Sequence, residues 1–270
     1  MNYKRTYIPM NGYTKLCEIG KSSLKYLEFG IIELTYNQQI EFDTNEMETA
    51  FILLGGQADF VFDDIKYEMV GKRRTVFEGK AHAVYVPRRK KVTIKSPWNV
   101  KIAVCQTPCN KDTTHALVTP SDIISSTLGK PTWKRNTDFI ISDTTPSKRL
   151  YVGEAFVYPG NWAGFPPHKH DADNMPEEGI AEEIYYYLFD PPQGFGIQRS
   201  YSKGEFDEAY VIESDTLVEF PKGYHTTVGA PGYNFYFLWA MAGDHKGFYR
   251  SSDPDHAWVT SVENILNKMT

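Results

Sequence analysis

Short runs of apolar and aromatic residues, separated by polar and turn-forming residues, recur along the whole chain. β-Branched and aromatic residues in such runs are typical of strands, and the Gly, Pro, Asn and Asp residues between them are typical of tight turns. A second series of the same kind extends from Leu150 to Phe237. Short strands at this spacing predict an antiparallel sandwich or a closed barrel. The runs of the first half lie at 31–36, 49–54, 58–62, 83–86 and 100–104.

Residues from about 108 to 148 interrupt this pattern because most of them are polar. We expect a crossover between two barrels here, with a short helical turn around 121–128. The sequence therefore predicts an all-β protein with two antiparallel barrels in tandem, at 1–130 and 131–270, and few short helices. One of these helices is expected at 262–268, where apolar residues recur at helical spacing.

Composition and charge narrow the possible functions. The chain has 270 residues, a net charge of −5 and a pI near 5.8, which argues against nucleic acid or an anionic membrane as its partner. It shows no apolar run long enough to cross a bilayer and no signal-peptide pattern at its start. Its three cysteines, Cys17, Cys105 and Cys109, offer no paired framework and are expected as free thiols. We therefore predict a cytoplasmic protein.

The strongest chemical signal is a set of three histidines and one carboxylate. His168 and His170 lie two residues apart, so on a strand both side chains point to one face. Glu183 begins a β-branched and aromatic run, and His225 follows the turn sequence Pro-Lys-Gly-Tyr, so each is expected on a further strand. Imidazole nitrogens and a carboxylate oxygen are typical ligands of a divalent transition metal. We predict that these four residues bind one metal ion and leave a position open for substrate.

Two neighbouring features limit this interpretation. Glu182 is expected on the opposite strand face from Glu183, and the two would exchange roles if the register differed by one residue. The first half of the chain has Glu48 at a comparable place, but no His-x-His precedes it. Residues 88–91 there read Arg-Arg-Lys-Lys, and cations cannot bind a divalent ion. The first barrel is therefore expected to bind no metal and to serve packing, oligomerisation or the shape of the active barrel.

These motifs resemble the cupin superfamily, and the second half of the chain resembles the 5-deoxyglucuronate isomerase family of myo-inositol catabolism. The resemblance implies two jelly-roll barrels of the cupin type, an aldose–ketose isomerase, a small acidic sugar as substrate and a homo-oligomer. It also implies a zinc, manganese or iron ion, among which spacing and composition do not choose. The resemblance covers roughly residues 148–260 and rests on Gly153-Glu154, Pro159–Trp162, PPHKHD, EEIYY, PPQGF, Gln198-Arg199, DEAYV, GYH, APGY, MAG and DPDH.

Isomerisation of this kind moves one proton between adjacent carbons and a second between their oxygens, so it needs a base near the metal. Glu154, on a strand of the same barrel, is expected to be that base. Arg199 is expected to bind the substrate carboxylate through two parallel hydrogen bonds. Tyr201 shares its strand face and is expected to donate to a sugar hydroxyl. Further candidates for substrate binding are Gln198, Tyr233, Lys169 and His256.

For several of these residues a structural role competes with the functional one. Lys169 lies between the metal histidines and is expected to face away from the ion. His256 belongs to the Asp-Pro-Asp-His segment, which can instead stabilise a loop, because Asp-Pro commonly begins a turn. Gln198 and Tyr233 can be ordinary polar residues of a barrel interior and of its mouth.

The chain departs from the family pattern at three places. Tyr187 stands where the family has His, Trp239 stands where it has Asn, and a basic stretch before the second barrel is reduced to residues 134–137. A Trp ring near a sugar pocket changes the shape of that pocket. Three alternatives therefore stay open: an isomerase of another uronate or anionic sugar, a sugar-binding cupin without activity, and an oxygen-using cupin with iron. Whether a proton or a hydride moves also stays open.

Overall fold

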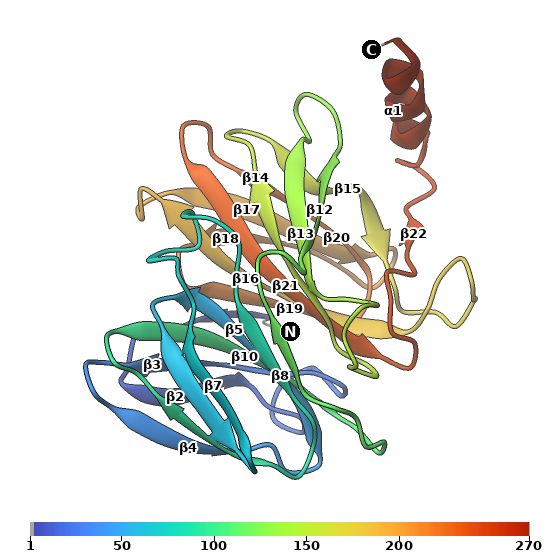
Figure 1. The fold of residues 1–270 in the computed structure, drawn as a ribbon. Coiled ribbons are helices and arrows are strands. Elements are labelled where there is room, and N and C mark those ends of the chain that lie inside the picture. The colour runs from blue at the N-terminus through green and yellow to red at the C-terminus, as the bar shows by residue number, and fades with distance from the viewer. Residues whose placement is uncertain (1–2, 270) are drawn as a thin grey trace.

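The structure is a computed structural model that describes residues 3–269. Within this range the chain forms four antiparallel sheets and one helix, α1 (Trp258–Met269), near its C-terminal end. Two sheets make a barrel from the first half of the chain, and two make a barrel from the second half. Figure 1 shows the first barrel, in blue and green, below the second, in yellow and red.

The first barrel combines a six-stranded and a four-stranded sheet, and apolar side chains such as Phe51, Phe60 and Ile102 fill the space between them. The six-stranded sheet runs, in spatial order, β11 (Ala116–Val118), β8 (Ala83–Val86), β5 (Met47–Gly55), β10 (Val100–Pro108), β3 (Glu28–Leu34) and β2 (Gly12–Cys17). The four-stranded sheet runs β4 (Gln39–Asp43), β9 (Lys91–Lys95), β6 (Ala58–Phe62) and β7 (Ile65–Val70).

The second barrel combines a seven-stranded and a five-stranded sheet, and its interior contains the aromatic residues Tyr185, Phe220 and Trp239. The seven-stranded sheet runs β1 (Lys4–Thr6), β19 (Thr216–Phe220), β16 (Ala181–Asp190), β21 (Asn234–Gly243), β14 (Tyr151–Val157), β13 (Arg135–Ile141) and β12 (Ile124–Leu128). The five-stranded sheet runs β18 (Phe206–Glu213), β17 (Phe195–Ser202), β20 (Tyr224–Gly229), β15 (Trp162–Lys169) and β22 (Ser251–Ser252).

A third hydrophobic core joins the two barrels between the six-stranded and the seven-stranded sheet. Successive side chains of a strand point to opposite faces, so the central strands of these sheets contribute to two cores at once. On β16, Tyr185 points into the second barrel, whereas Ile184 and Tyr186 point towards the first. This double burial explains why the central strands read as continuous apolar runs instead of alternating ones.

Buried carboxylates also join the barrels. Glu48 on β5 accepts hydrogen bonds of 2.7–2.9 Å from the three successive backbone amides of residues 148–150, which lead into β14. In the reverse direction, Glu182 on β16 accepts bonds from the backbone amides of Lys25 and Tyr26. Hydrogen bonds to a charged acceptor are about twice as strong as neutral ones. These contacts therefore fix the position of one barrel on the other.

The prediction of antiparallel barrels with little helix is confirmed, and the expected C-terminal helix is present as α1. The helical turn expected around 121–128 is wrong, because residues 124–128 form the edge strand β12. β12 pairs with β13 and β1 pairs with β19, so both short strands belong to a sheet of the second barrel. The sheets therefore do not divide the chain at residue 130. Edge strands such as β12 carry mostly polar residues, which hides them from a hydrophobic pattern.

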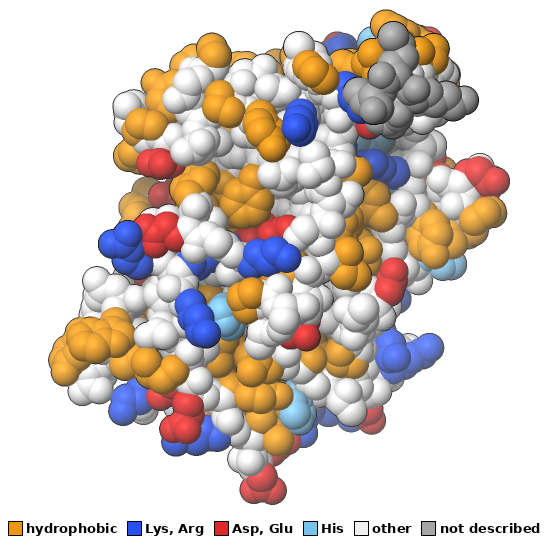
Figure 2. Space-filling model, turned by 45° about the horizontal axis from the view of Figure 1, so that its top comes forward, with side chains coloured by type: hydrophobic (Ala, Val, Ile, Leu, Met, Phe, Trp, Pro, Cys, Tyr) orange, Lys and Arg blue, Asp and Glu red, His pale blue; other side chains and the backbone are white. Residues whose placement is uncertain are grey.

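Two properties of the molecule bear on membrane and nucleic-acid binding. In the part of the chain that the structure describes, no helix is long and apolar enough to cross a membrane. On the face drawn in Figure 2, basic side chains are scattered among acidic and apolar ones. That face therefore presents no continuous basic surface.

Candidate metal centre in the second barrel

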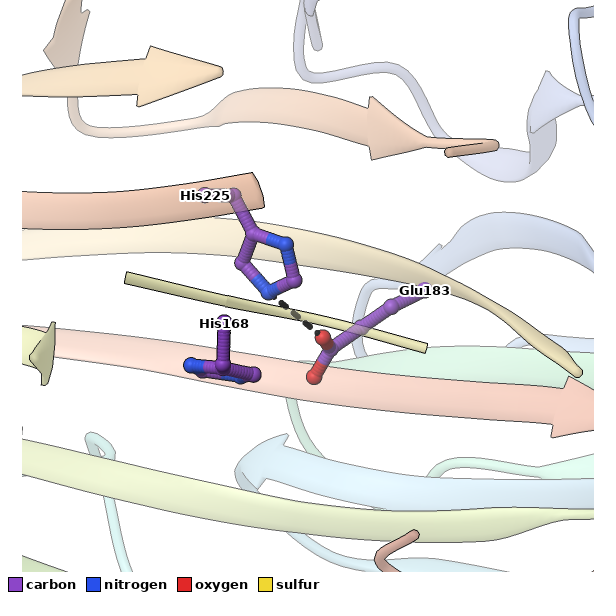
Figure 3. A group of neighbouring side chains, drawn as sticks. All are labelled: His168, Glu183 and His225. Carbon is purple, nitrogen blue, oxygen red and sulfur yellow. Dashed lines mark ion pairs between the residues drawn. The ribbon is translucent and has the colours of Figure 1, made fainter. Parts of the chain in front are cut away.

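The second barrel brings the four predicted metal ligands together in its interior. His168 and His225 are direct partners across β15 and β20, so their side chains lie on one face of the five-stranded sheet. Glu183 reaches them from β16 in the opposite sheet, and His170 follows directly after β15. All four side chains are buried. Figure 3 shows His168 and His225 beside the Glu183 carboxylate.

The distances within this group suit a single ion. One ligand atom from each of His168, Glu183 and His225 lies within 4.8 Å of the other two. Oε2 of Glu183 lies 3.0 Å from Nε2 of His225 and 3.0 Å from Nε2 of His170. The ring centres of His170 and His225 are 5.3 Å apart. Ligand atoms bound at about 2.0–2.2 Å from a common ion have separations of a few ångströms, so His168, Glu183 and His225 require only small adjustments to bind one. His170 lies outside this group of three, with its ring centre 6.3 Å from that of His168, and would have to move further to become the fourth ligand.

Electrostatics keep most of these groups in the form that binds a metal. Burial lowers the pKa of His225, and burial together with the nearby Arg250 lowers that of His168 far more, so both imidazoles are neutral at pH 7. Burial acts to raise the pKa of Glu183, but its hydrogen bond with His170 and the adjacent His225 imidazole outweigh burial and lower this pKa to about 2. Burial acts to lower the pKa of His170, but Glu183 outweighs it and the pKa is raised. A metal ion must therefore compete with a proton chiefly at His170.

Two details of hydrogen bonding fit an ion at this position. Both ring nitrogens of His225 are buried without a hydrogen-bond partner. Nε2 lies 3.0 Å from the Glu183 carboxylate, but the angle between the two groups does not allow a hydrogen bond. Nδ1 of His170 lies 2.7 Å from the backbone oxygen of Ala181. With its proton on Nδ1, His170 presents the lone pair of Nε2 to the interior, which is the usual arrangement of a metal-bound histidine. A buried lone pair without a donor is costly unless a cation binds it.

The turn before His225 holds the histidine segments together. Gly223 has a φ of +85°, a conformation that residues with a side chain rarely adopt. Its backbone amide donates a 2.7 Å hydrogen bond to Oδ2 of Asp171, the residue after His170. A Cβ at this position would lie 2.7 Å from the backbone oxygen of Tyr201. The glycine of the Pro-x-Gly-x-His motif is therefore required both by the turn and by the close approach of β17.

Sequence reasoning missed two arginines that face the metal ligands. Arg135 pairs with Val157, a residue of the barrel interior, and is itself buried. Arg250 precedes β22, where Ser252 is paired with His168, so Arg250 has the strand parity of the interior. Neither guanidinium forms an ion pair within residues 3–266, whose side chains the structure describes. Arg135 could have been found from the short basic stretch at 134–137, whereas no motif in the sequence around Arg250 indicates a role for that residue.

These arginines influence each other and the site. Burial, followed by the charge of Arg250, lowers the pKa of Arg135 to about 10, and burial lowers the pKa of Arg250. Both side chains remain cationic at neutral pH, and their charges repel each other. Arg135 is buried and Arg250 is half-buried. Cations in such places that form no ion pair are costly, and a bound anion would relieve that cost.

Aromatic rings form the remaining walls. Phe139, Tyr151 and Phe248 surround Trp239 with ring-centre distances of 5.6–5.8 Å. Tyr185 lies 5.6 Å from His225 between ring centres, and its hydroxyl has no hydrogen-bond partner among residues 3–266. Burial, and then Glu183, raise the pKa of Tyr185 far above its ordinary value, so this hydroxyl keeps its proton. The site thus contains a proton donor that the motif-based assignment overlooked.

The structure does not bring Glu154 to the site. Glu154 pairs with Leu238 on the face of the seven-stranded sheet that meets the first barrel. There it binds the guanidinium of Arg73 and accepts a 2.7 Å hydrogen bond from Tyr236. Its predicted role as the base is therefore not supported. The neighbouring Gly153, which does face the interior, is in contact with Trp239.

Arg199 and Tyr201 also point away from the metal ligands. On β17 it is Ser200 that pairs with His225, so the residues on either side of Ser200 face the outer surface. Arg199 forms an ion pair with Asp207 at 2.7 Å, and its guanidinium lies over the ring of Tyr201. The Tyr201 hydroxyl donates to Asp253. Their predicted catalytic and carboxylate-binding roles are not supported, because strand parity places them outside the barrel.

Of the next two candidates, one lies inside the barrel and one faces away from it. Gln198 lies inside the barrel and accepts a 2.7 Å hydrogen bond from the Tyr187 hydroxyl. Lys169 is paired with Asp171 and Glu178 and faces away, as its strand parity predicts.

Two candidates lie outside the group of ligands. Tyr233 adjoins Asn234, which pairs with Asp190 at the far end of β16 from Glu183. His256 lies in a turn whose backbone amide donates to Asp253, beside Arg199 on the outer surface. Their predicted roles in substrate binding are therefore not supported.

Comparison with known proteins agrees with the fold and the motifs. A 5-deoxy-glucuronate isomerase of Geobacillus kaustophilus is 35% identical over 237 residues, which cover 87% of this chain and 86% of that protein. One of Bacillus subtilis strain 168 is 33% identical over 255 residues, 92% of this chain and 94% of that protein. The crystal structure of an IolB-like protein from Salmonella typhimurium superimposes with a TM-score of 0.92 at 28% identity, covering 96% of this chain and all of that one.

More distant structures show the same fold. An oxalate decarboxylase of Bacillus subtilis gives a TM-score of 0.64 at 13% identity and covers 98% of this chain and 84% of that one. The cupin fold predicted from the motifs is thereby confirmed. The model of the KduI/IolB family matches residues 7–259. Confirming the predicted resemblance, this chain belongs to the KduI/IolB family.

Proposed function

We propose that this protein is a metal-dependent aldose–ketose isomerase that converts 5-deoxyglucuronate to 5-dehydro-2-deoxygluconate in inositol catabolism. One observation carries the proposal: a buried centre of His168, Glu183 and His225, with His170 hydrogen-bonded to Glu183, shares its interior with two arginines that form no ion pair with a carboxylate. A sugar acid fits this interior, because its carboxylate can bind the arginines and its neighbouring carbonyl and hydroxyl oxygens can bind a metal ion. Relatives of similar length named 5-deoxy-glucuronate isomerase support the same substrate.

The ligand set fits zinc, manganese or iron. His168, His170, Glu183 and His225 would hold such an ion, which would supply a Lewis acid for a carbonyl oxygen of the sugar. This chain supplies the neutral imidazoles and the ionised Glu183 that such an ion requires.

Arg135 and Arg250 orient the substrate. Both are cationic, and either can bind a carboxylate through two parallel hydrogen bonds. Both guanidinium groups act to lower the pKa of His168 and of Tyr185, which supports a position of their charge near the centre. A carboxylate fixed by these guanidinium groups leaves the opposite end of the sugar to approach the metal ligands. Orientation of this kind can contribute several kcal/mol to a rate, roughly up to 7–11 kcal/mol in favourable intramolecular systems.

Tyr185 is the group best placed to hold a proton during the reaction. Its hydroxyl is protonated and lacks a partner in the described protein, so it can donate a hydrogen bond to a substrate oxygen. The rings of Phe220 and Phe237, whose centres lie 4.7 and 4.4 Å from that of Tyr185, exclude water around it. Gln198 and Tyr187 are hydrogen-bonded to each other and form the part of the wall further along β16.

The function is tested by proton NMR of 5-deoxyglucuronate incubated with the protein in deuterated water, before and after removal of metal. We expect metal-dependent formation of the 2-keto sugar, with deuterium entering next to the new carbonyl. Conversion without deuterium would indicate hydride transfer or a shielded proton. A metal-loaded protein that leaves 5-deoxyglucuronate unchanged would contradict the proposed substrate.

The position of Trp239 in the barrel interior suggests a second substrate for the same NMR experiment. Because this ring occupies interior space next to Gly153, a uronate of different shape should be offered in parallel, with glucuronate as the first choice. Conversion of glucuronate alone would keep the isomerase and change its sugar. We also propose that the enzyme is a cytoplasmic homo-oligomer, for which sedimentation and fractionation are the measurements.

A further inference from the structure

A hollow of about 860 Å³ lies at one end of the first barrel, where β3 and β5 end and where β2 and β10 begin. All the residues that line it belong to positions 11–101, so none of them is a metal ligand or a neighbour of one. We propose that this hollow is a second binding site, for a sugar that carries an anionic group. Its polar and aromatic lining consists of Asn11, Glu33, Thr35, Tyr36, Gln57, Lys72, Arg73, Arg74, Trp98, Asn99 and Lys101.

Two exposed aromatic rings stand at this hollow. Trp98 and Tyr36 are 60% and 69% exposed, and their ring centres lie 5.9 Å apart at an angle of 46°. Large aromatic surfaces left in water lose the free energy that burial would provide, so a neighbouring pair of them marks a contact surface. The C–H face of a sugar ring is a flat apolar surface that covers such a ring, while the sugar hydroxyls remain free for polar groups.

The charges of the hollow favour an anion. Its lining has four cationic side chains and one carboxylate, Glu33, on a protein whose net charge is −5. Arg73 is occupied by Glu154, and Lys101 by Asp215 and Glu33. Lys72 has no ion-pair partner within the described residues, so it is the cation that remains for a ligand.

Arg74 can assist Lys72. Its ion pair with Glu78 is formed by two exposed side chains, 87% and 38% exposed for Arg74 and Glu78. Exposed pairs of this kind stabilise a protein only weakly, so a bound anion can compete with Glu78 for this guanidinium. Lys72 and Arg74 thus define the end of the hollow that would bind the anionic group.

Side-chain amides supply the groups that recognise hydroxyls. Nε2 of Gln57 donates a 2.8 Å hydrogen bond to the backbone oxygen of Gly71, which leaves its Oε1 to accept. The amides of Asn11 and Asn99 make no hydrogen bond with side chains of the described residues. Each can donate and accept at once, as a sugar hydroxyl requires. Aromatic rings, free amides and an unpaired cation together indicate a sugar acid or a sugar phosphate rather than a purely apolar ligand.

Fluorine NMR of the full-length, metal-loaded protein labelled with 5-fluorotryptophan tests this site. The chain has five tryptophans, and the Trp98→Phe variant assigns the Trp98 signal. The probes are glucuronate and glucose 6-phosphate, which separate a sugar acid from a sugar phosphate, with glucose as the neutral control. We expect the Trp98 signal to shift saturably with at least one anionic sugar and much less with glucose. Lys72→Ala should weaken that binding about fivefold.

The chain contains its own control. Trp258 is 64% exposed and lies on α1, outside the hollow, so its signal should not move. Equal shifts at Trp98 and Trp258, or no shift of Trp98 at millimolar sugar, would overturn the proposal. A lower oligomeric state of Trp98→Ala in sedimentation would overturn it too, because the rings would then be a contact between copies. Binding through the catalytic site alone would move Trp239 and leave Trp98 in place.

Discussion

Arg73 and Glu154 form an ion pair that is buried at the junction of the two barrels. The guanidinium also donates to the backbone oxygens of Leu53 and Gly79, and the carboxylate accepts from Tyr236. Every hydrogen-bonding group of this pair is therefore engaged. The pair links the loop after β7 to β14, a strand of the metal-bearing barrel, and it explains why a glutamate that resembles a family motif is far from the chemistry.

We expect Glu154→Gln to destabilise the protein by about 3–5 kcal/mol, because it leaves the Arg73 cation buried without a counter-ion. The metal content should not change, since Glu154 faces away from the ligands. Urea unfolding, with metal analysis of the folded protein, measures both effects.

An exposed pair provides the matched control. Asp207→Asn removes the partner of Arg199 on the outer surface and should cost less than about 1 kcal/mol. Replacing both members of the buried pair with apolar residues of similar volume should recover part of the loss. Reduced isomerase activity of folded, metal-loaded Glu154→Gln, with unchanged stability, would return Glu154 to a catalytic role.

Removal of one imidazole should empty the metal centre. His225→Ala deletes a ligand whose two nitrogens have no other hydrogen-bond partner, so metal affinity should fall by more than about 100-fold and isomerase activity should disappear. The fold should persist, because apolar packing fills the barrel around the site. Elemental analysis and circular dichroism provide the two readouts. His245→Ala, which changes an exposed histidine, is the control and should keep its metal. Full metal occupancy in His225→Ala would contradict the ligand assignment.

The sequence was informative about the ligands because their spacing encodes geometry. His168 and His170 share a strand face by parity, and the glycine before His225 marks a turn that only a residue without a side chain readily forms. The same parity rule also separated Glu183 from Glu182, which the structure places towards Lys25 of the first barrel.

The substrate side of the site could not be predicted in this way. Whether the interior face of β17 carries Ser200 or Arg199 depends on its pairing with β20, which no local pattern reveals. Arg250 reaches the interior through a two-residue strand, β22, that is too short to leave a hydrophobic signature. Glu154 was misplaced because β14 is buried on both faces and its sequence does not tell which face meets the metal.

Replacing Arg135 or Arg250 should change the KM for the sugar, whereas replacing Arg199 should not. Arg250→Ala removes a cation from the interior, so we expect KM for the acidic sugar to rise about 10- to 100-fold if binding in the ground state is lost. Arg199→Ala is the control, because its guanidinium is already paired with Asp207 outside the barrel, and KM should stay within about twofold of wild type. Steady-state kinetics with metal-saturated enzyme decide the matter. An increase in KM for Arg199→Ala alone would restore the earlier assignment.

Asp253 should make stability depend on pH. Burial acts to raise the pKa of Asp253, but the Tyr201 hydroxyl, the Asp255 amide and Lys203 outweigh it and lower this pKa. A carboxyl with a lowered pKa binds fewer protons in the folded than in the unfolded state. Its stabilisation is therefore present above the ordinary pKa of about 4 and is lost as the pH falls below it.

We expect the free energy of unfolding of the wild type to decline more steeply between about pH 5 and pH 3 than that of Asp253→Asn. Asp255→Asn provides the control, because Asp255 is largely exposed and pairs only with Lys203, so its curve should follow the wild type. Urea denaturation at a series of pH values measures all three. Parallel curves for wild type and Asp253→Asn would show that the Tyr201–Asp253 bond does not stabilise the charged carboxylate. The hydrogen bond of the buried Tyr201 on the outer face of the five-stranded sheet would then need another explanation.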